Sequence, residues 1–271
     1  MLTINFKDFP LHDGDIVLDL GCGEGRHVIN AYLQANVVAI GVDLSHRDLT
    51  IATLRAAPYI GEPPQDSHER RQDSHERTQD SHERTQNESK ENCVGRFYLQ
   101  QADAAYLPFA DASIDKIICS EVLEHIENYR GVLCEINRVL KPKGILAVSV
   151  PREWPEKICW WLSEAYHQKE GGHIRIFNAR ELRADIEALD FAFTARHWAH
   201  ALHVPFWWLK CLCWKSQDKS CIIKLYHCML VWDLMRRPWF TQTLERWLNP
   251  IIGKSVVMYF KKPEKFSYRE S

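Results

Sequence analysis

Val17-Leu18-Asp19-Leu20-Gly21-Cys22-Gly23-Glu24-Gly25 is the stretch that decides the fold. An apolar run leads into three glycines at alternate positions, which is typical of a strand that turns tightly into a helix. Glycine leaves no Cβ between the chain and a bound ligand, so a cofactor that carries a nucleoside fits this turn. The dinucleotide fingerprint G-x-G-x-x-G needs its third glycine at position 26, which is Arg26 here.

Strands and helices alternate on both sides of this turn. We expect strands over residues 15–20, 37–42, 96–101, 116–119 and 145–150, with helices over 26–34 and from His46 onward. Ser45 is the predicted cap of the helix that begins near His46. Continuous apolar strands between helices predict a parallel α/β sheet that is covered on both faces.

Acidic residues stand at the carboxyl ends of two predicted strands. Asp43 closes the second strand and Asp103 follows the third. A carboxylate after the second strand can accept hydrogen bonds from both hydroxyls of a ribose. Each aspartate taken alone is more often a turn residue, so the prediction depends on their joint occurrence with the glycine turn.

A polar repeat follows the second predicted helix. Asp-Ser-His-Glu-Arg occurs three times at a spacing of seven residues, from Asp66, Asp73 and Asp80. A coiled coil needs apolar positions in each heptad and this one has none, so we interpret residues 62–92 as a solvated insertion. Its histidines would lie about 10 Å apart in a helix, too far to share one ion. No metal site is predicted.

Length and composition indicate one folded unit with insertions. The chain has 271 residues, of which 45% are apolar, and a formal net charge of −2. Nine cysteines are scattered through predicted strands and helices and indicate reduced thiols. The first ten residues lack the features of a secretion signal, and charges interrupt every long apolar run, so we expect a cytoplasmic protein. No nucleic-acid partner is expected.

The last third of the chain differs in charge and aromatic content. Residues 200–271 hold twelve Lys and Arg against five Asp and Glu, and seven of the ten tryptophans lie from Trp198 onward. Tryptophans next to basic residues, such as Trp207, Trp208 and Lys210, suit a membrane interface, where the indole ring lies at the depth of the lipid headgroups. A buried helical subdomain is the alternative, because aromatic residues most often serve cores.

Five motifs occur in order along residues 17 to about 151. They are VLDLGCGEG from Val17, GVDLS from Gly41, QADAAYLPFADASID from Gln101, SEVLEH from Ser120 and RVLKPKG from Arg138. This series resembles the type 11 family of class I S-adenosylmethionine-dependent methyltransferases, including those of quinone biosynthesis. Lys143 departs from the family, which usually has a second glycine in that turn.

The resemblance implies a cofactor, S-adenosyl-L-methionine, and the residues that bind it. The glycine turn would hold the methionine part, Asp43 the ribose hydroxyls and Asp103 the adenine amine, while Ser120 and Glu121 would line the end that carries the methyl group. The implied cofactor-binding residues are Asp19, Gly21, Cys22, Gly23, Asp43, Leu44, Asp103, Ala104 and Ser120.

An oxygen acceptor would need a base, whereas an already nucleophilic acceptor would not. Histidine titrates near neutral pH, so His125 and His173 are the candidates, with Glu121 as a third. The resemblance favours His173, because a histidine after the fifth strand often approaches the acceptor in this family. The alternative is that each histidine is a hydrogen-bonded structural residue.

We therefore expect a Rossmann-like, mostly parallel sheet of seven strands with helices on both faces and an antiparallel last strand. Residues 1–199 and 254–263 would form the methyltransferase domain. Residues 200–253 would form a cap of two or three helices over the acceptor site, inserted before the last strand, because this connection far exceeds a hairpin loop.

The expected activity is methyl transfer to a small, hydrophobic acceptor of isoprenoid, quinone or lipid type. The acceptor would be presented at the inner face of a membrane, with surface contact through residues 200–240. An NAD(P)-dependent oxidoreductase and a non-catalytic methyltransferase-like binding module are the alternatives. The sequence does not predict the oligomeric state.

Overall fold

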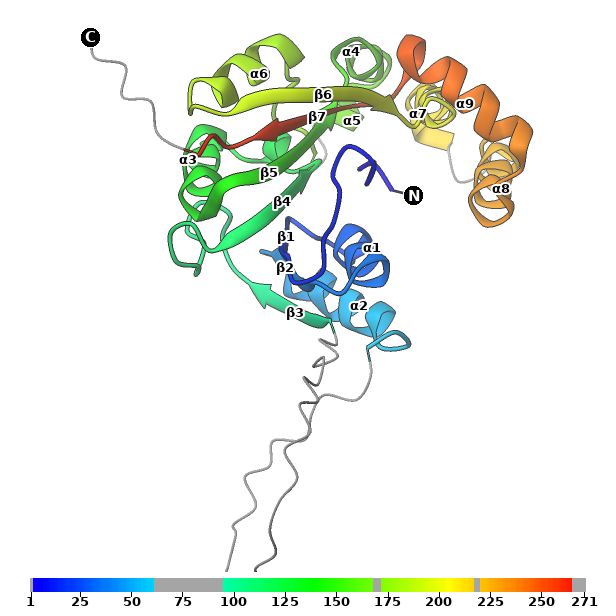
Figure 1. The fold of residues 1–271 in the computed structure, drawn as a ribbon. Helices are drawn as coiled ribbons and strands as arrows, with labels where there is room; N and C mark the ends of the chain where they lie inside the picture. The colour runs from blue at the N-terminus through cyan, green and yellow to red at the C-terminus, as the bar shows by residue number, and fades with distance from the viewer. Residues whose placement is uncertain (1, 61–94, 168–171, 217–219, 265–271) are drawn as a thin grey trace, which may run out of the picture.

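The computed structural model describes residues 2–60, 95–167, 172–216 and 220–264 (Figure 1). The polar repeat predicted at 62–92 lies outside these residues. The described strands form one sheet in the order β3-β2-β1-β4-β5-β7-β6. The strands are β1 (Ile16–Leu20), β2 (Val38–Asp43), β3 (Arg96–Gln101), β4 (Ile114–Ser120), β5 (Leu140–Pro151), β6 (Ala192–Ala199) and β7 (Ser255–Lys261).

The direction of the strands confirms the predicted fold. Strands β1 to β5 pair in parallel, whereas β7 is antiparallel to both of its neighbours, β5 and β6. The chain order runs outward from β1 to β3 on one side and from β4 on the other. The carboxyl ends of β1 and β4 therefore flank the point at which the strand order reverses, where open α/β sheets bind their ligands.

Helices cover both faces of the sheet, as predicted (Figure 1). They are α1 (Arg26–Gln34), α2 (His46–Ala56), α3 (Tyr129–Val139), α4 (Glu153–Leu162), α5 (Glu164–His167), α6 (Ala179–Glu187), α7 (His203–Leu212), α8 (Cys221–Arg236) and α9 (Trp239–Ile252), with short 3₁₀ turns η1 (Leu123–His125) and η2 (Trp214–Ser216). The α2 helix begins at His46 because the Ser45 hydroxyl accepts a hydrogen bond from the Asp48 N–H, as predicted.

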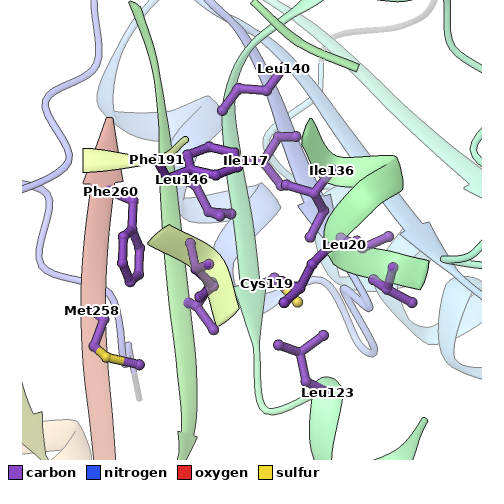
Figure 2. Close-up of a cluster of buried hydrophobic side chains, with 14 of the residues drawn as sticks. Leu20, Ile117, Cys119, Leu123, Ile136, Leu140, Leu146, Phe191, Met258 and Phe260 are labelled. Carbon is purple, nitrogen blue, oxygen red and sulfur yellow. The ribbon is translucent and has the colours of Figure 1, made fainter. Parts of the chain in front are cut away.

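Two apolar cores lie on opposite faces of the sheet. Side chains alternate along a strand, so Ile117 and Ile118 of β4 enter different cores. The core that contains Ile117 packs β4 and β5 against α3 and α6, and Figure 2 shows Leu123 and Ile136 within it. The core that contains Ile118 is closed by α1 and by the N-terminal segment, whose Phe9 is fully buried.

Two differences from the predicted elements have local causes. Strand β5 begins at Leu140, five residues early, and it pairs irregularly with β4 before Ile145. In this stretch Lys143 has φ of 67°, the left-handed conformation that favours glycine, at the position where the resembled family has one. Helices α4 and α5 were not predicted. Pro155 stands within the first turn of α4, where a helix tolerates it.

Three described α-helices, α7 to α9, lie in the long connection between β6 and β7, where the sequence predicted two or three helices. Helices α8 and α9 extend beyond the end of the sheet (Figure 1). A small separate core of Leu202, Phe206, Ile223 and Leu230 joins α7 to α8. Within the described ranges, no helix combines the length and the apolar character that crossing a bilayer requires.

Candidate functional site

A cavity of about 450 Å³ opens at the carboxyl edge of the sheet. The glycine turn after β1, the ends of β2 and β3 and the segment after β4 all contribute to its lining. Eight of the predicted site residues line it: Gly21, Gly23, Asp43, Leu44, Asp103, Ala104, Glu121 and His125. The structure thus brings together residues up to about a hundred positions apart at the place where the fold predicts a ligand.

The glycine turn is shaped by the residues that surround it. Gly21 and Gly23 have φ of 69° and 50°, which L side chains rarely adopt. A Cβ at Gly21 would collide with the side chain of Val122, whereas a Cβ at Gly23 would meet no atom within 4 Å. Gly21 is therefore required by packing, while Gly23 leaves open space next to the cavity.

Asp43 is held at the cavity wall by two backbone donors. The Gly23 N–H donates to its Oδ2 over 2.7 Å, and the Ser45 N–H donates to its Oδ1 over 2.8 Å. These bonds use one acceptor position on each oxygen, and a carboxylate has about four. Both oxygens can still accept from a ligand, as the predicted contact with two ribose hydroxyls requires.

Asp103 also lines the cavity, in an exposed position. Its Oδ1 accepts a hydrogen bond from the Ala105 N–H over 2.9 Å, so the carboxylate also shapes the local turn. Ala102 and Ala104 flank it in the lining, and Leu44 is 69% exposed at the rim. Small apolar groups beside a hydrogen-bond acceptor suit a flat base that carries an amine.

Four predicted site residues, all within the described ranges, lie outside the lining of this cavity. Asp19 is buried and its Oδ2 accepts from the Val28 N–H over 2.9 Å, and burial raises its pKa to about 7. Cys22 is buried under the turn, and burial raises the pKa of its thiol. The Ser120 hydroxyl lies 2.8 Å from Ser149 Oγ. His173, the fourth, lies behind His125.

Glu121 marks the end of the cavity nearest β7. Its φ of 58° is unusual for a residue other than glycine, and such strain often occurs at functional sites. The Ser149 hydroxyl donates to its Oε1 over 3.2 Å, and Lys254 Nζ lies 3.7 Å from its Oε2. The carboxylate is therefore fixed at the cavity wall next to the base of the helical insertion.

The two predicted histidines are neighbours with different exposure. His125 lines the cavity, and the His173 ring packs edge-on against it with centroids 5.1 Å apart. His173 Nδ1 lies 2.7 Å from Glu156 Oε1, which also accepts from the Tyr166 hydroxyl over 3.0 Å. Sequence reasoning missed Glu156, because nothing near this residue in the chain indicates that α4 brings it to His173.

The charge of the cavity distinguishes between ligand classes. Four carboxylates line it, from Asp43, Asp48, Asp103 and Glu121, and none of its described lining residues is Lys or Arg. Lys254, which is not part of the lining, lies 3.7 Å from Glu121 and compensates that carboxylate in part. A pyrophosphate beside Asp43, Asp48 and Asp103 would be repelled by their negative charge, whereas a cationic sulfonium ligand is attracted to it. The lining therefore favours a positively charged nucleoside over a dinucleotide.

Comparison with known proteins agrees with this chemistry. A family model described as Methyltransferase domain matches residues 5–195. The 27-O-demethylrifamycin SV methyltransferase of Amycolatopsis mediterranei is 28% identical over 51% of this chain and 39% of its own length. The demethylmenaquinone methyltransferase of Lactobacillus johnsonii is 31% identical over 57% of this chain and 52% of its own length. The chain thus spans about half or less of these curated relatives.

Solved structures share the fold at low sequence identity. The YcgJ protein of Bacillus subtilis has a TM-score of 0.56 and 17% identity, with 96% of this chain and 97% of that chain covered. The [4+2]-cyclase SpnF has a TM-score of 0.53 and 17% identity, with 93% and 77% covered. Since the family model covers more than half of the residues, this chain belongs to the methyltransferase domain family, the S-adenosylmethionine-dependent enzymes that its five motifs resemble.

Proposed function

We propose that this chain transfers the methyl group of S-adenosylmethionine to a small hydrophobic acceptor at the carboxyl edge of the sheet. The observation that carries the proposal is the acidic lining of the cavity beside the glycine turn. Asp43 would bind the ribose and Asp103 the adenine amine. The glycine turn would leave room for the methionine part.

The sulfonium cofactor supplies an activated methyl group, so the protein's task is largely positioning. An acceptor atom held in line with the carbon–sulfur bond reacts as part of one complex, which can contribute roughly 7–11 kcal/mol to lowering the barrier. Glu121 and His125 line the cavity and would orient the acceptor. Of the three predicted catalytic residues, only His173 lies outside the lining.

The hydrophobic class of acceptor is supported by the helical insertion. Trp239 and Trp247 of α9 are 79% and 76% exposed, and Met235 of α8 is 76% exposed. Arg236 of α8 and Arg246 of α9 are also exposed. Exposed tryptophans beside arginines suit the headgroup region of an anionic membrane, from which a lipid or isoprenoid acceptor could be taken up.

The sequence predicted a membrane contact that included Trp207 and Trp208 of α7, whereas the exposed surface described above belongs to α8 and α9. Trp207 and Trp208 of α7 are half-buried: the Trp208 indole N–H donates to the Pro155 carbonyl over 3.2 Å, and the Trp207 ring packs against Tyr166. These two residues therefore attach α7 to α4 and α5. The proposed membrane contact moves to α8 and α9, which extend away from the sheet (Figure 1).

A transfer assay tests the activity and the acceptor class together. The chain is incubated with S-adenosylmethionine labelled in the methyl group, either with extracted membrane lipids or with water-soluble phenols, and the label is traced by chromatography. We expect label in the lipid fraction. Label only in the soluble phenols would overturn the lipid assignment, and tight cofactor binding without any transfer would favour the non-catalytic binding module.

Vesicle sedimentation tests the membrane surface. We expect the chain to sediment with anionic vesicles and the Trp239→Ala, Trp247→Ala double variant to remain in solution. Trp161→Ala removes an equally exposed tryptophan, 83% accessible on α4, and is the matched control that should still sediment. Failure of the unmodified chain to sediment would contradict the proposal.

A further inference from the structure

Glu124 is a buried carboxylate that accepts no hydrogen bond from the residues that the structure describes. Its side chain is 0% exposed, and neither of its oxygens has a hydrogen-bond partner among those residues. A buried polar group that makes no hydrogen bond costs free energy, and a buried charge costs more unless it is paired or bound to a metal. Neither the fold nor the proposed methyl transfer explains this residue.

Two histidines stand next to this carboxylate. His173 Nε2 lies 4.0 Å from Glu124 Oε1, and one ligand atom each from Glu124, His125 and His173 lie within 4.8 Å of one another. The atoms that share an ion at bonds of about 2.1 Å lie roughly 3–3.5 Å apart. Side-chain movements of about an ångström would therefore bring all three groups onto one ion.

The hydrogen bonds around the cluster prepare both rings for a metal. The Gly172 carbonyl, 3.1 Å from His125 Nδ1, can only accept, so that nitrogen carries the proton. His173 Nδ1 likewise faces the Glu156 carboxylate over 2.7 Å. Each neutral ring then has its lone pair on Nε2, and the second-shell acceptors are of the kind that orient metal-ligating histidines.

We propose that Glu124, His125 and His173 bind one divalent transition-metal ion next to the cofactor cavity. Two imidazoles and one carboxylate suit Zn²⁺, Fe²⁺ or Mn²⁺ better than Mg²⁺ or Ca²⁺, which prefer oxygen ligands. The sequence predicted no metal site, because Glu124 read only as part of a motif and His173 lies 49 positions further along the chain.

The ion would have a role in the proposed methyl transfer, on which this part of the inference rests. His125 belongs both to the ligand set and to the cavity lining, so an ion held by these residues would be accessible from the cavity. A bound cation lowers the pKa of a hydroxyl that coordinates it. The acceptor would then be a hydrophobic phenol or enol that binds through its oxygen and releases its hydroxyl proton to water. The bond from sulfur to the methyl carbon would break as the bond from that oxygen to the methyl carbon forms, and S-adenosylhomocysteine would leave.

Zinc titration of the full chain tests the site without reference to activity. Protein freed of metal with EDTA is titrated with Zn²⁺ alone by calorimetry, and its metal content is measured by plasma mass spectrometry. We expect the Glu124→Gln and His173→Gln variants each to bind one equivalent less than the unmodified chain. His227→Gln removes an exposed histidine of α8 and is the control that should bind the same amount. Histidines of the polar repeat remain in every sample, so zinc bound there cancels.

Equal zinc uptake by the unmodified chain and both cluster variants would overturn the proposal. Glu124→Gln keeps the shape of the side chain, and titration with S-adenosylmethionine shows whether each of the two variants is folded. The same samples separate the two hypotheses: zinc uptake without cofactor binding would contradict the methyltransferase proposal alone, and cofactor binding with no difference in zinc uptake would contradict the metal site alone.

Discussion

Apolar side chains serve different purposes in the sheet region and in the helical insertion. Helix α3 has 11 residues and buries four apolar side chains against the sheet. Helix α8 has 16 residues and buries only two apolar side chains, Ile223 and Leu230, together with Asp233. Leu225 and Met235 of α8 are 74% and 76% exposed. The sheet region buries its apolar side chains in its own core. The helical insertion leaves many of its apolar side chains exposed and available for contact with another molecule.

Each of the two regions also contains a buried carboxyl group. Replacing one of them should give the largest change in the free energy of unfolding that we expect. Burial raises the pKa of Asp19 in β1 and of Glu245 in α9, each to about 7. A carboxyl with a raised folded-state pKa supports folding fully below its unfolded pKa and loses that support as the pH rises through about 7. For Asp19, whose ordinary value is 3.8, the loss amounts to about 4 kcal/mol.

We expect Asp19→Asn to be more stable than the unmodified chain at pH 8 by up to about 4 kcal/mol and nearly equal at pH 4. The asparagine oxygen can still accept from the Val28 N–H. Glu245→Gln should gain less stability at pH 8, because water partly screens the charge of this half-buried carboxylate. Urea unfolding at both pH values measures the difference, and an identical gain at pH 4 and pH 8 would contradict the assignment.

Truncating one leucine in each region tests the comparison directly. Leu133 of α3 is 1% exposed, whereas Leu225 of α8 is 74% exposed. We expect Leu133→Ala to cost about 3 kcal/mol, because it leaves a cavity in the core, and Leu225→Ala to change the free energy of unfolding by less than about 0.5 kcal/mol. A similar cost at both positions would show that α8 is packed in solution and not available as a free surface.

The glycine turn offers a matched pair with a smaller effect. Alanine at Gly21 would take an unfavourable backbone conformation and collide with Val122, so we expect a loss of about 2 kcal/mol. Alanine at Gly23 meets no neighbour, and we expect a loss of about 1 kcal/mol. Thermal unfolding measures both. Equal losses would mean that the Val122 side chain moves aside without cost.

The sequence predicted those features that are determined by residues close together in the chain, and it missed contacts between residues that are far apart in the chain. Apolar runs, the Ser45 cap and the glycine turn act within a few residues, and the strands and helices around them were predicted closely. The neighbourhood of Glu124, His173 and Glu156 depends on α4 folding back over the sheet edge, so no spacing in the chain reveals it. The same holds for Trp207, whose burial depends on its contact with Tyr166.

Calorimetric titration with S-adenosylmethionine and, separately, with NAD tests the central claim most directly. We expect saturable binding of S-adenosylmethionine to the unmodified chain, none of NAD, and a loss on the order of 100-fold, about 3 kcal/mol, in Asp43→Ala. Asp13→Ala is the control, because the exposed Asp13 also accepts a backbone hydrogen bond, from the Asn36 N–H, but lies outside the cavity lining. Tight binding of NAD without binding of S-adenosylmethionine would contradict the account.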